Sequence, residues 1–271
     1  MNETAVGVFD SGIGGLSVLH HLQHLLPHDN FIYLADQAHV PYGPRPQAEI
    51  QAFTVAITQL LLTQSIKQLV VACNTASAAA LSHLRQQFPE LPIVGMEPAV
   101  KPAAAQTKTG KVGVLATAGT FESQRYASLM ARFAQNVILY EDPCHGLVEL
   151  IEAGNTEGAE TAVLLHQILQ PMITAGVDTL VLGCTHYPFV SPLLTRLLAT
   201  APHPVTIIDP APAVARQARR ILNQRGLMTA RTSPGYTRYL TTGPAAALAQ
   251  PLAHLLGDKE AVVETAVVIT T

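Results

Sequence analysis

The sequence predicts an α/β protein made of two pseudo-symmetric, doubly wound domains with mostly parallel sheets. Short apolar runs rich in β-branched residues alternate with longer stretches of helical periodicity, as in parallel sheets covered by helices. Three patches also recur in the same order, VGVFDSG with VGVLATAG, LVVACNT with LVLGCTH, and EPAV with APAV. The second copies start 106, 111 and 114 residues after the first (112 − 6, 184 − 73 and 211 − 97), which indicates two related halves.

The strands are expected where the apolar runs lie. Between them, stretches such as LSVLHHLQHLL (16–26) and EIQAFTVAITQLLL (49–62) have the spacing of amphipathic helices. In order along the chain, the predicted strands are 5–9, 31–35, 69–73, 92–96, 111–116, 136–140, 179–184 and 205–209.

The segment after the second repeat predicts two more helices and a further strand. The helices are expected at 212–222 (PAVARQARRIL) and 244–256 (PAAALAQPLAHLL), and the strand lies between them at 236–242 (YTRYLTT). An apolar tail follows at 261–269. We expect this segment to return and pack against the first half. The first domain would then comprise residues 1–97 and 210–271, and the second 98–209, with the active site in the interdomain cleft.

Composition excludes several classes of protein. A formal net charge of −3 with 16 Lys and Arg argues against nucleic acid or an anionic membrane as partner. No stretch reaches the ~18 uninterrupted apolar residues of a membrane helix, and the start, MNETAVGVFDSGIGG, lacks the features of a signal peptide. We therefore expect a cytoplasmic protein. Three cysteines, an odd number without a CxxC motif, fit neither a disulfide scaffold nor a zinc ribbon.

Two of the three cysteines share one local setting. Cys73 ends LVVAC and Cys184 ends TLVLGC, and small polar residues follow each. If the halves face each other, the thiols meet across the cleft, each where a helix begins. A helix N-terminus stabilises anions and favours a thiolate. One thiolate could then remove a proton from carbon while the other thiol delivers one from the far side, which is two-base racemisation.

Other interpretations of these residues remain open on the pattern alone. Both cysteines could be ordinary buried thiols, and Cys73, Cys184 and His186 with a water would make a catalytic zinc pattern. Cys144, after a proline, is expected to be structural or incidental. Asp10 could simply cap the next helix.

The remaining motifs also have simple structural readings. Tyr42 and Gly43 could be only turn residues among prolines 41, 44 and 46, and His186 only a loop histidine. The histidines at 20, 21, 24 and 28 have spacing that could bind metal, although a solvated helix face is the simpler interpretation. The glycine-rich DSGIGG turn (10–15) lacks the spacing of a nucleotide site, and none of the five lysines has a pyridoxal-phosphate setting.

Six blocks together resemble the glutamate racemases of the aspartate/glutamate racemase superfamily. They are DSGIGG (10–15), YLAD (33–36), VPYGPR (40–45), CNTAS (73–77), GMEP (95–98) and GCTHYP (183–188), in the family's order over most of the chain. The resemblance implies a cofactor-independent, metal-free enzyme that interconverts L- and D-glutamate and supplies D-glutamate for bacterial peptidoglycan.

The resemblance also assigns roles to residues. Cys73 would take the proton from D-glutamate with Asp10 assisting, and Cys184 would take it from L-glutamate with His186 assisting. Substrate contacts would fall on Asp10, Ser11, Tyr42, Gly43, Asn74, Thr75, Thr185 and His186.

The family's auxiliary glutamate could be Glu149 or Glu152, which lie three residues apart and could share a helix face. The ending LIEAG matches the family pattern better at Glu152. The lean surface charge and the resemblance both favour a homodimer. The rival activities are an aspartate racemase and a non-catalytic amino-acid-binding protein.

Overall fold

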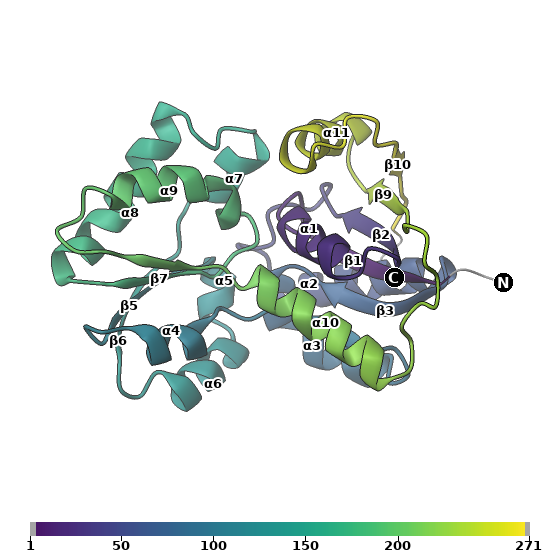
Figure 1. Cartoon of the computed structure of the whole chain (residues 1–271), viewed down its shortest axis with the longest axis horizontal. Helices are drawn as coiled ribbons and strands as arrows, with labels where there is room; N and C mark the ends of the chain where they lie inside the picture. Colours follow the sequence, from purple (N-terminus) through teal and green to yellow (C-terminus); the bar gives the residue numbers. More distant parts are fainter. Residues whose placement is uncertain (1–3, 269–271) are drawn as a thin grey trace. The chain divides into compact units, whose positions relative to one another are not determined.

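The computed structural model describes residues 4–268, and Ile269 at the end of the predicted apolar tail lies outside them. Two compact units divide the chain, one of Met1–Met96 and Ala211–Thr271, the other of Glu97–Pro210. The expected α/β class with parallel sheets is confirmed, because every strand pair in both units is parallel (Figure 1).

The first unit contains a six-stranded sheet in the order β10-β9-β2-β1-β3-β4. Helix α1 packs with α10, and α2 packs with α3. Figure 1 shows α10 beside α1. The strands are β1 (Ala5–Asp10), β2 (Asn30–Ala35), β3 (Ile66–Val71), β4 (Ile93–Gly95), β9 (Thr237–Thr241) and β10 (Val263–Thr265); the helices are α1 (Leu16–Leu25), α2 (Gln47–Thr63), α3 (Asn74–Gln87), α10 (Ala211–Gln224), α11 (Ala245–Pro251) and η2 (Leu252–Leu256).

The segment after residue 210 returns to the first unit, as expected. Strand β9 pairs with β2, with Tyr33 opposite Tyr239, and β10 extends the sheet beyond β9. The single helix predicted over 244–256 is wrong, because α11 ends at Pro251 and the next five residues form a π-helical turn. Proline has no N–H for an α-helical hydrogen bond, so the helix changes its pattern there.

The second unit contains a four-stranded sheet in the order β6-β5-β7-β8. Strand β6 (Ile138–Asp142) starts two residues later than the strand predicted at 136–140, and its first residue, Ile138, pairs with Lys111. The strands are β5 (Lys111–Leu115), β6 (Ile138–Asp142), β7 (Thr179–Leu182) and β8 (Thr206–Ile208); the helices are α4 (Val100–Gln106), α5 (Ala118–Phe121), α6 (Gln124–Phe133), α7 (Leu147–Glu152), α8 (Ala159–Ala175), η1 (Tyr187–Val190) and α9 (Ser191–Leu198).

Both sheets contain the same four-strand arrangement. If the strands of each half are numbered along the chain, the order is 2-1-3-4 in both. One backbone bond is also repeated. The Ala72 N–H donates to the Phe9 carbonyl at 2.8 Å, and the Gly183 N–H donates to the Leu115 carbonyl at 2.6 Å. The repeat seen in the sequence is therefore a repeat of topology.

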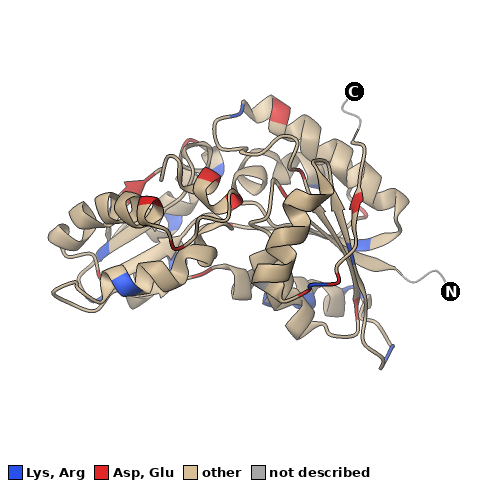
Figure 2. Cartoon of the chain, turned by 90° about the horizontal axis from the view of Figure 1, so that it is seen from above, with Lys and Arg blue, Asp and Glu red and all other residues tan. Residues whose placement is uncertain are grey.

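The cores are apolar and the charged side chains are few. Phe9, Leu34, Ile57, Leu69 and Leu81 belong to the core of the first unit, and Val112, Val114 and Val181 to that of the second. Lys and Arg occupy scattered positions on the ribbon (Figure 2). Within residues 4–268, no helix has both the length and the apolar character needed to cross a membrane.

Candidate active site

The candidate residues gather where the strand order of each sheet reverses. In a sheet of order 2-1-3-4, the crevice beyond the carboxyl ends of strands 1 and 3 is the usual ligand site. Asp10 and Ser11 stand at the end of β1, and Cys73 follows β3. In the second unit, Cys184 follows β7, the equivalent of β3. Each unit thus places one cysteine at its own reversal point.

Cys73 is the N-cap residue of α3. Its side chain is nearly buried, and its Sγ accepts the Ala76 N–H at 3.4 Å. The thiol also lies 3.7 Å from the Ser11 hydroxyl. Because α3 is 14 residues long and its N-terminus carries partial positive charge, this position favours the thiolate.

Asp10 is fully buried at the end of β1. Its Oδ1 accepts the Gly12 N–H at 2.8 Å, and the N-cap position of α1 belongs to Gly15. Asp10 is therefore not the N-cap residue of α1. A Cβ on Gly15 would lie 2.7 Å from Asp10 Cβ and 3.1 Å from the Tyr33 hydroxyl, so the glycine lets the turn pack against the carboxylate.

Tyr42 is more than a turn residue, since its side chain is buried in the core of the first unit. Its hydroxyl donates to Asp36 Oδ2 at 2.5 Å. Burial raises the pKa of this phenol well above 10, and the charges of Asp36, Cys73 and Asp10 raise it further. Tyr42 therefore stays neutral beside the two candidate catalytic groups of this unit.

Asn74 and Thr75 form the first turn of α3 and are both buried. Among the described residues, neither Oδ1 nor Nδ2 of the Asn74 amide has a hydrogen-bond partner. A buried amide without partners is costly in a folded protein. Its position next to Cys73 suits a group that binds a polar ligand.

In the second unit, three side chains form a chain of contacts. His186 Nδ1 lies 3.7 Å from Cys184 Sγ, and His186 Nε2 lies 2.6 Å from Glu152 Oε1. Cys184 and Thr185 are buried as well. Glu152 thus contacts His186, whereas Glu149 is exposed. His186 is no free loop histidine.

The protonation of His186 follows from these contacts. Burial alone lowers the pKa of the imidazole, but its hydrogen bonds to Cys184 and Glu152, and their charges, raise that pKa well above 6.5. A carboxylate only accepts hydrogen bonds, so the His186 Nε2–H donates to Glu152 and Nδ1 faces the Cys184 sulfur. The arrangement can hold a proton next to Cys184 and return it.

The helix expected directly after Cys184 is absent from this place. A four-residue 3-10 turn, η1, follows instead, and α9 begins only at Ser191. Pro188 and Pro192 stand in the first positions of η1 and α9, where they lack the N–H groups that would extend one helix through both. The neighbour of the Cys184 sulfur in this turn is the imidazole of His186, at 3.7 Å.

Comparison with known proteins identifies the family. The sequence matches the Asp/Glu/Hydantoin racemase family over residues 16–218. The chain belongs to this racemase family.

The similar proteins of this family are glutamate racemases. A glutamate racemase of Ectopseudomonas mendocina is 50% identical over 258 residues, which are 95% of this chain and 97% of that one. Glutamate racemase isoform RacE1 of Bacillus anthracis has the same fold, with a TM-score of 0.86, 31% identity and full coverage of both chains. Escherichia coli glutamate racemase, solved with L-glutamate and the activator UDP-MurNAc-ala, gives a TM-score of 0.84 at 33% identity, covering 98% and 99% of the chains.

The third cysteine of this racemase lies near the second group without joining it. Cys144 has a backbone φ of 50°, and its Sγ donates to the Asp142 carbonyl at 3.4 Å. Burial raises the pKa of its thiol well above 9, and Asp142 raises it further. Tyr187 lies beside it and has a raised pKa for the same reason, burial, with Cys144 and Cys184 adding to it. A neutral buried thiol fits the structural role expected of Cys144.

The histidine group of the racemase lies on α1 and just beyond it. His24 Nδ1 lies 2.9 Å from the His20 carbonyl, and His28 Nδ1 lies 3.1 Å from the Ser233 carbonyl. Burial, with His24 and His21 nearby, lowers the pKa of His20. Across residues 4–268, no three His, Cys, Asp or Glu side chains are grouped so that they could hold a metal ion.

Sequence reasoning overlooked Asp36. It stands in the YLAD block, is fully buried, and accepts a hydrogen bond from the Tyr42 hydroxyl. The signal was an acidic residue directly after a buried strand, where parallel sheets place functional groups.

Proposed function

We propose that the chain interconverts L- and D-glutamate without a cofactor, using Cys73 and Cys184 as its two acid–base groups. One observation carries the proposal. Two sheets that share the strand order 2-1-3-4 each place a nearly buried cysteine at the same position, after the third strand of the half. The substrate comes from the relatives, which are glutamate racemases at about 50% identity, and from the Escherichia coli enzyme solved with L-glutamate.

The chemical step moves two protons and leaves the electron count unchanged. One sulfur, as thiolate, takes the α-proton, and the C–H electron pair stays on the α-carbon and its carboxylate. The other sulfur, as thiol, then gives its proton to the opposite face of that carbon. The configuration inverts, and the two sulfurs exchange protonation states. The reverse reaction uses the same groups in the opposite roles.

The groups around each thiol suit this division of work. Cys73 takes the proton from D-glutamate, where the N-terminus of α3 favours its thiolate and Asp10 assists. Cys184 takes the proton from L-glutamate, and His186 with Glu152 holds the proton that this sulfur needs as an acid. Substrate contacts come from Ser11, Tyr42, Gly43, Asn74, Thr75 and Thr185. Buried N–H and hydroxyl groups stabilise the negative charge that develops on the α-carboxylate.

The wider setting belongs to the same proposal. The two units are two domains, residues 1–97 with 210–271 and residues 98–209, and each supplies one thiol to the substrate. The enzyme acts in the cytoplasm as a homodimer, and its D-glutamate feeds peptidoglycan synthesis. Depletion of the protein should then make growth depend on added D-glutamate.

The direct test is racemisation of each enantiomer in D₂O. Optical rotation of L-glutamate should decay to zero, and the product should carry deuterium at the α-carbon. A lasting rotation of L-glutamate, together with decay of L-aspartate, would favour an aspartate racemase. A lasting rotation of both with saturable binding would favour an amino-acid-binding protein. If activity required stoichiometric zinc, the two-thiol mechanism would be wrong.

A further inference from the structure

Asp36 connects the Tyr42–Gly43 segment to the rest of the first unit. The Tyr42 hydroxyl donates to Oδ2 at 2.5 Å, and the Thr242 hydroxyl donates to Oδ1 at 2.7 Å. His39 Nδ1 lies 2.9 Å from Oδ1 and 3.0 Å from Oδ2. Since a carboxylate only accepts hydrogen bonds, one fully buried side chain receives three donors from two distant parts of the chain.

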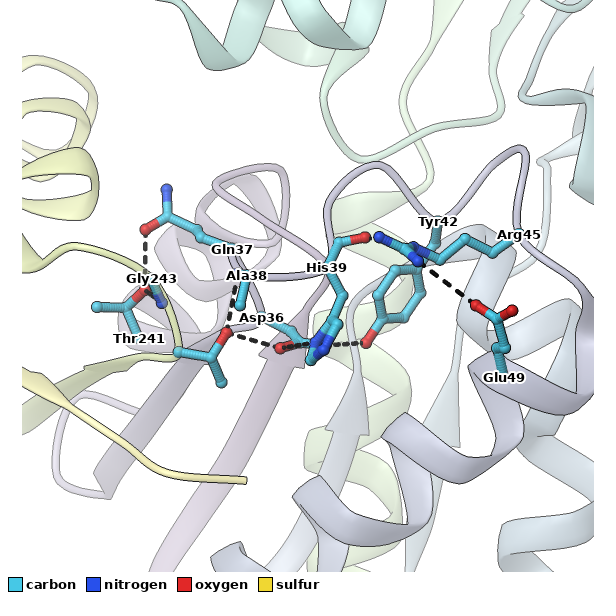
Figure 3. Close-up of polar contacts among 10 residues, drawn as sticks. Asp36, Gln37, Ala38, His39, Tyr42, Arg45, Glu49, Thr241 and Gly243 are labelled. Atoms are coloured by element: carbon cyan, nitrogen blue, oxygen red, sulfur yellow. Dashed lines mark hydrogen bonds and ion pairs between the residues drawn. The ribbon is translucent and has the colours of Figure 1, made fainter. Parts of the chain in front are cut away.

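The segment between Asp36 and Tyr42 is also held from outside. The His39 ring stacks on Phe53 of α2, with ring centroids 4.0 Å apart and planes 20° apart. The Arg45 Nε donates to the His39 carbonyl at 2.6 Å, and its guanidinium lies over the same phenyl ring, 5.6 Å from the centroid. Figure 3 shows Arg45 beside His39 and Tyr42, with Arg45 paired to Glu49.

The C-terminal segment supplies the other side of the connection. The Ala38 N–H donates to the Thr242 hydroxyl at 3.0 Å, and the Thr241 hydroxyl donates to Gln37 Oε1 at 2.9 Å (Figure 3). The Thr242 N–H donates to the Ala35 carbonyl, which continues the β2–β9 pairing past the sheet. The Asp36 carboxylate is thus bonded to a residue 206 positions away in the chain.

The Asp36 carboxylate and its three donors, here called the anchor, lie directly beside the candidate catalytic groups Asp10 and Cys73. The Asp36 N–H donates to the Asp10 carbonyl at 2.9 Å, and the charges of Cys73 and Asp10 act on the Tyr42 hydroxyl. A phenol has one proton, and that of Tyr42 is committed to Asp36. The hydroxyl therefore has none to offer a substrate carboxylate, so the donors that this segment can present are the backbone N–H groups of Tyr42 and Gly43.

We propose that Asp36 is a positioning residue for substrate binding, which fixes the backbone of Tyr42 and Gly43 through the Tyr42 hydroxyl and ties it to Thr242. This inference rests on the proposed glutamate racemase activity and adds a residue outside the substrate contacts. Binding groups need placement to within about half an ångström, which a rigid supporting contact provides. Loss of the anchor should therefore weaken glutamate binding more than it slows the proton transfers.

The test compares Asp36→Asn with Tyr42→Phe, the double variant and Asp178→Asn. Asparagine keeps the shape of Asp36 but offers one acceptor oxygen to three donors. Asp178 is the matched control, because it receives the Thr107 and Thr179 hydroxyls and the Lys108 and Thr109 N–H groups in the other unit. We expect Asp36→Asn to raise KM for glutamate about tenfold with kcat changed less than about threefold, and Asp178→Asn to leave KM unchanged.

The double variant separates positioning from a general loss of folded protein. If Asp36 acts through the Tyr42 hydroxyl, Asp36→Asn should add little to the KM of Tyr42→Phe, so the two effects should not be additive. An unchanged KM in Asp36→Asn, or full additivity with Tyr42→Phe, would overturn the proposal.

Amide hydrogen exchange gives a readout that does not need turnover. Exchange at residues 37–45 should become faster in Asp36→Asn and stay as in the wild type in Asp178→Asn. If the wild type failed to racemise glutamate but this exchange pattern appeared, the proposed function would be wrong while Asp36 still fixed the segment. Unchanged exchange in Asp36→Asn would refute the positioning role in either case.

Discussion

The two halves of the molecule repeat a strand order but surround their thiols differently. In the first, Cys73 caps a 14-residue helix, whose N–H groups and partial charge favour a thiolate. In the second, a four-residue 3-10 turn follows Cys184, and His186 with Glu152 lies beside the sulfur. The first setting favours a thiolate, and the second places an imidazole and a carboxylate beside the thiol. The same strand position therefore has different neighbours in the two halves.

Replacing each cysteine tests this comparison most strongly. Cys73→Ser and Cys184→Ser should each lower racemisation by about 10³-fold or more, because a hydroxyl is a far weaker acid than a thiol. The remaining thiol should still exchange the α-proton of one enantiomer. Cys184→Ser should incorporate deuterium into D-glutamate, and Cys73→Ser into L-glutamate, as NMR of the recovered amino acid would show.

Cys144→Ser is the control for these variants, since the Cys144 Sγ donates to the Asp142 carbonyl, whereas the Sγ atoms of Cys73 and Cys184 lie against Ser11 and His186. Its turnover should stay within roughly threefold of the wild type. Equal deuterium exchange of both enantiomers by either active-site variant would refute the assignment of one thiol to each enantiomer.

Glu152→Gln should disturb only the second half. The amide keeps the shape but removes the negative charge that holds the His186 proton, so turnover should fall about tenfold to a hundredfold. Glu149→Gln is a close control, because Glu149 lies one helical turn earlier and is exposed. Its activity should not change.

The reaction equilibrium determines which measurement can show a different effect of Glu152→Gln on the two enantiomers. The two enantiomers have equal free energies, so kcat/KM must fall by the same factor in both directions. The difference should therefore appear in isotope exchange, with L-glutamate losing its α-proton more slowly in Glu152→Gln while exchange of D-glutamate is less affected. A larger loss for D-glutamate would place Glu152 with the wrong thiol.

The raised pKa of His186 predicts a pH dependence of stability that arises in the second half. Burial lowers this pKa, but the contacts with Cys184 and Glu152 raise it well above 6.5, so the folded protein binds the proton more tightly than the unfolded chain. The stabilisation is then complete below pH ~6.5 and is lost as pH rises through the raised pKa. The urea midpoint of the wild type should fall over that range, and that of His186→Gln should fall less.

Imidazole NMR checks the protonation state directly. His186 should keep the chemical shifts of an imidazolium at neutral pH, and Glu152→Gln should move its titration to lower pH. A neutral His186 at pH 7 in the wild type would contradict the proton-storing role of the second half.

The sequence was sufficient for the architecture and for the positions of both cysteines, because these depend on local patterns. Apolar runs mark buried strands, and the carboxyl ends of parallel strands share one edge of a sheet. The structure that follows Cys184 could not be predicted from the sequence, since the effect of two prolines on the next helix depends on how the turn packs. Glu149 and Glu152 could not be separated by spacing, because only one of them meets His186 in space.

The contact between Asp36 and Thr242 was even less accessible to sequence reasoning. It joins residues 206 positions apart, and nothing local to either one predicts the other. Asp36 belongs to the YLAD block, but its three donors come from the loop after β2 and from Thr242, the residue that follows β9. Such contacts are set by the packing of the whole unit.

The smallest predicted effect concerns the residues just before the two cysteines, Ala72 and Gly183. Both donate their N–H to the equivalent carbonyl of the neighbouring strand. A Cβ on Gly183 would lie 2.7 Å from the Leu115 carbonyl oxygen and 2.8 Å from Ala116 Cβ. Gly183→Ala should therefore lower the free energy of unfolding by about 1–3 kcal/mol, as overpacked cores do. Ala72→Gly should cost only about 1 kcal/mol, mainly through backbone entropy.

Urea denaturation of both variants tests whether the two halves can have the same type of residue at this equivalent position. The clash in Gly183→Ala is with backbone, which cannot rotate away as a side chain can, so β7 and the residues that follow it must shift. Racemisation should then fall together with stability, whereas Ala72→Gly should leave turnover nearly unchanged. Wild-type stability in Gly183→Ala would mean that the second half accepts the first half's residue, and that the glycine is no structural requirement of the Cys184 side.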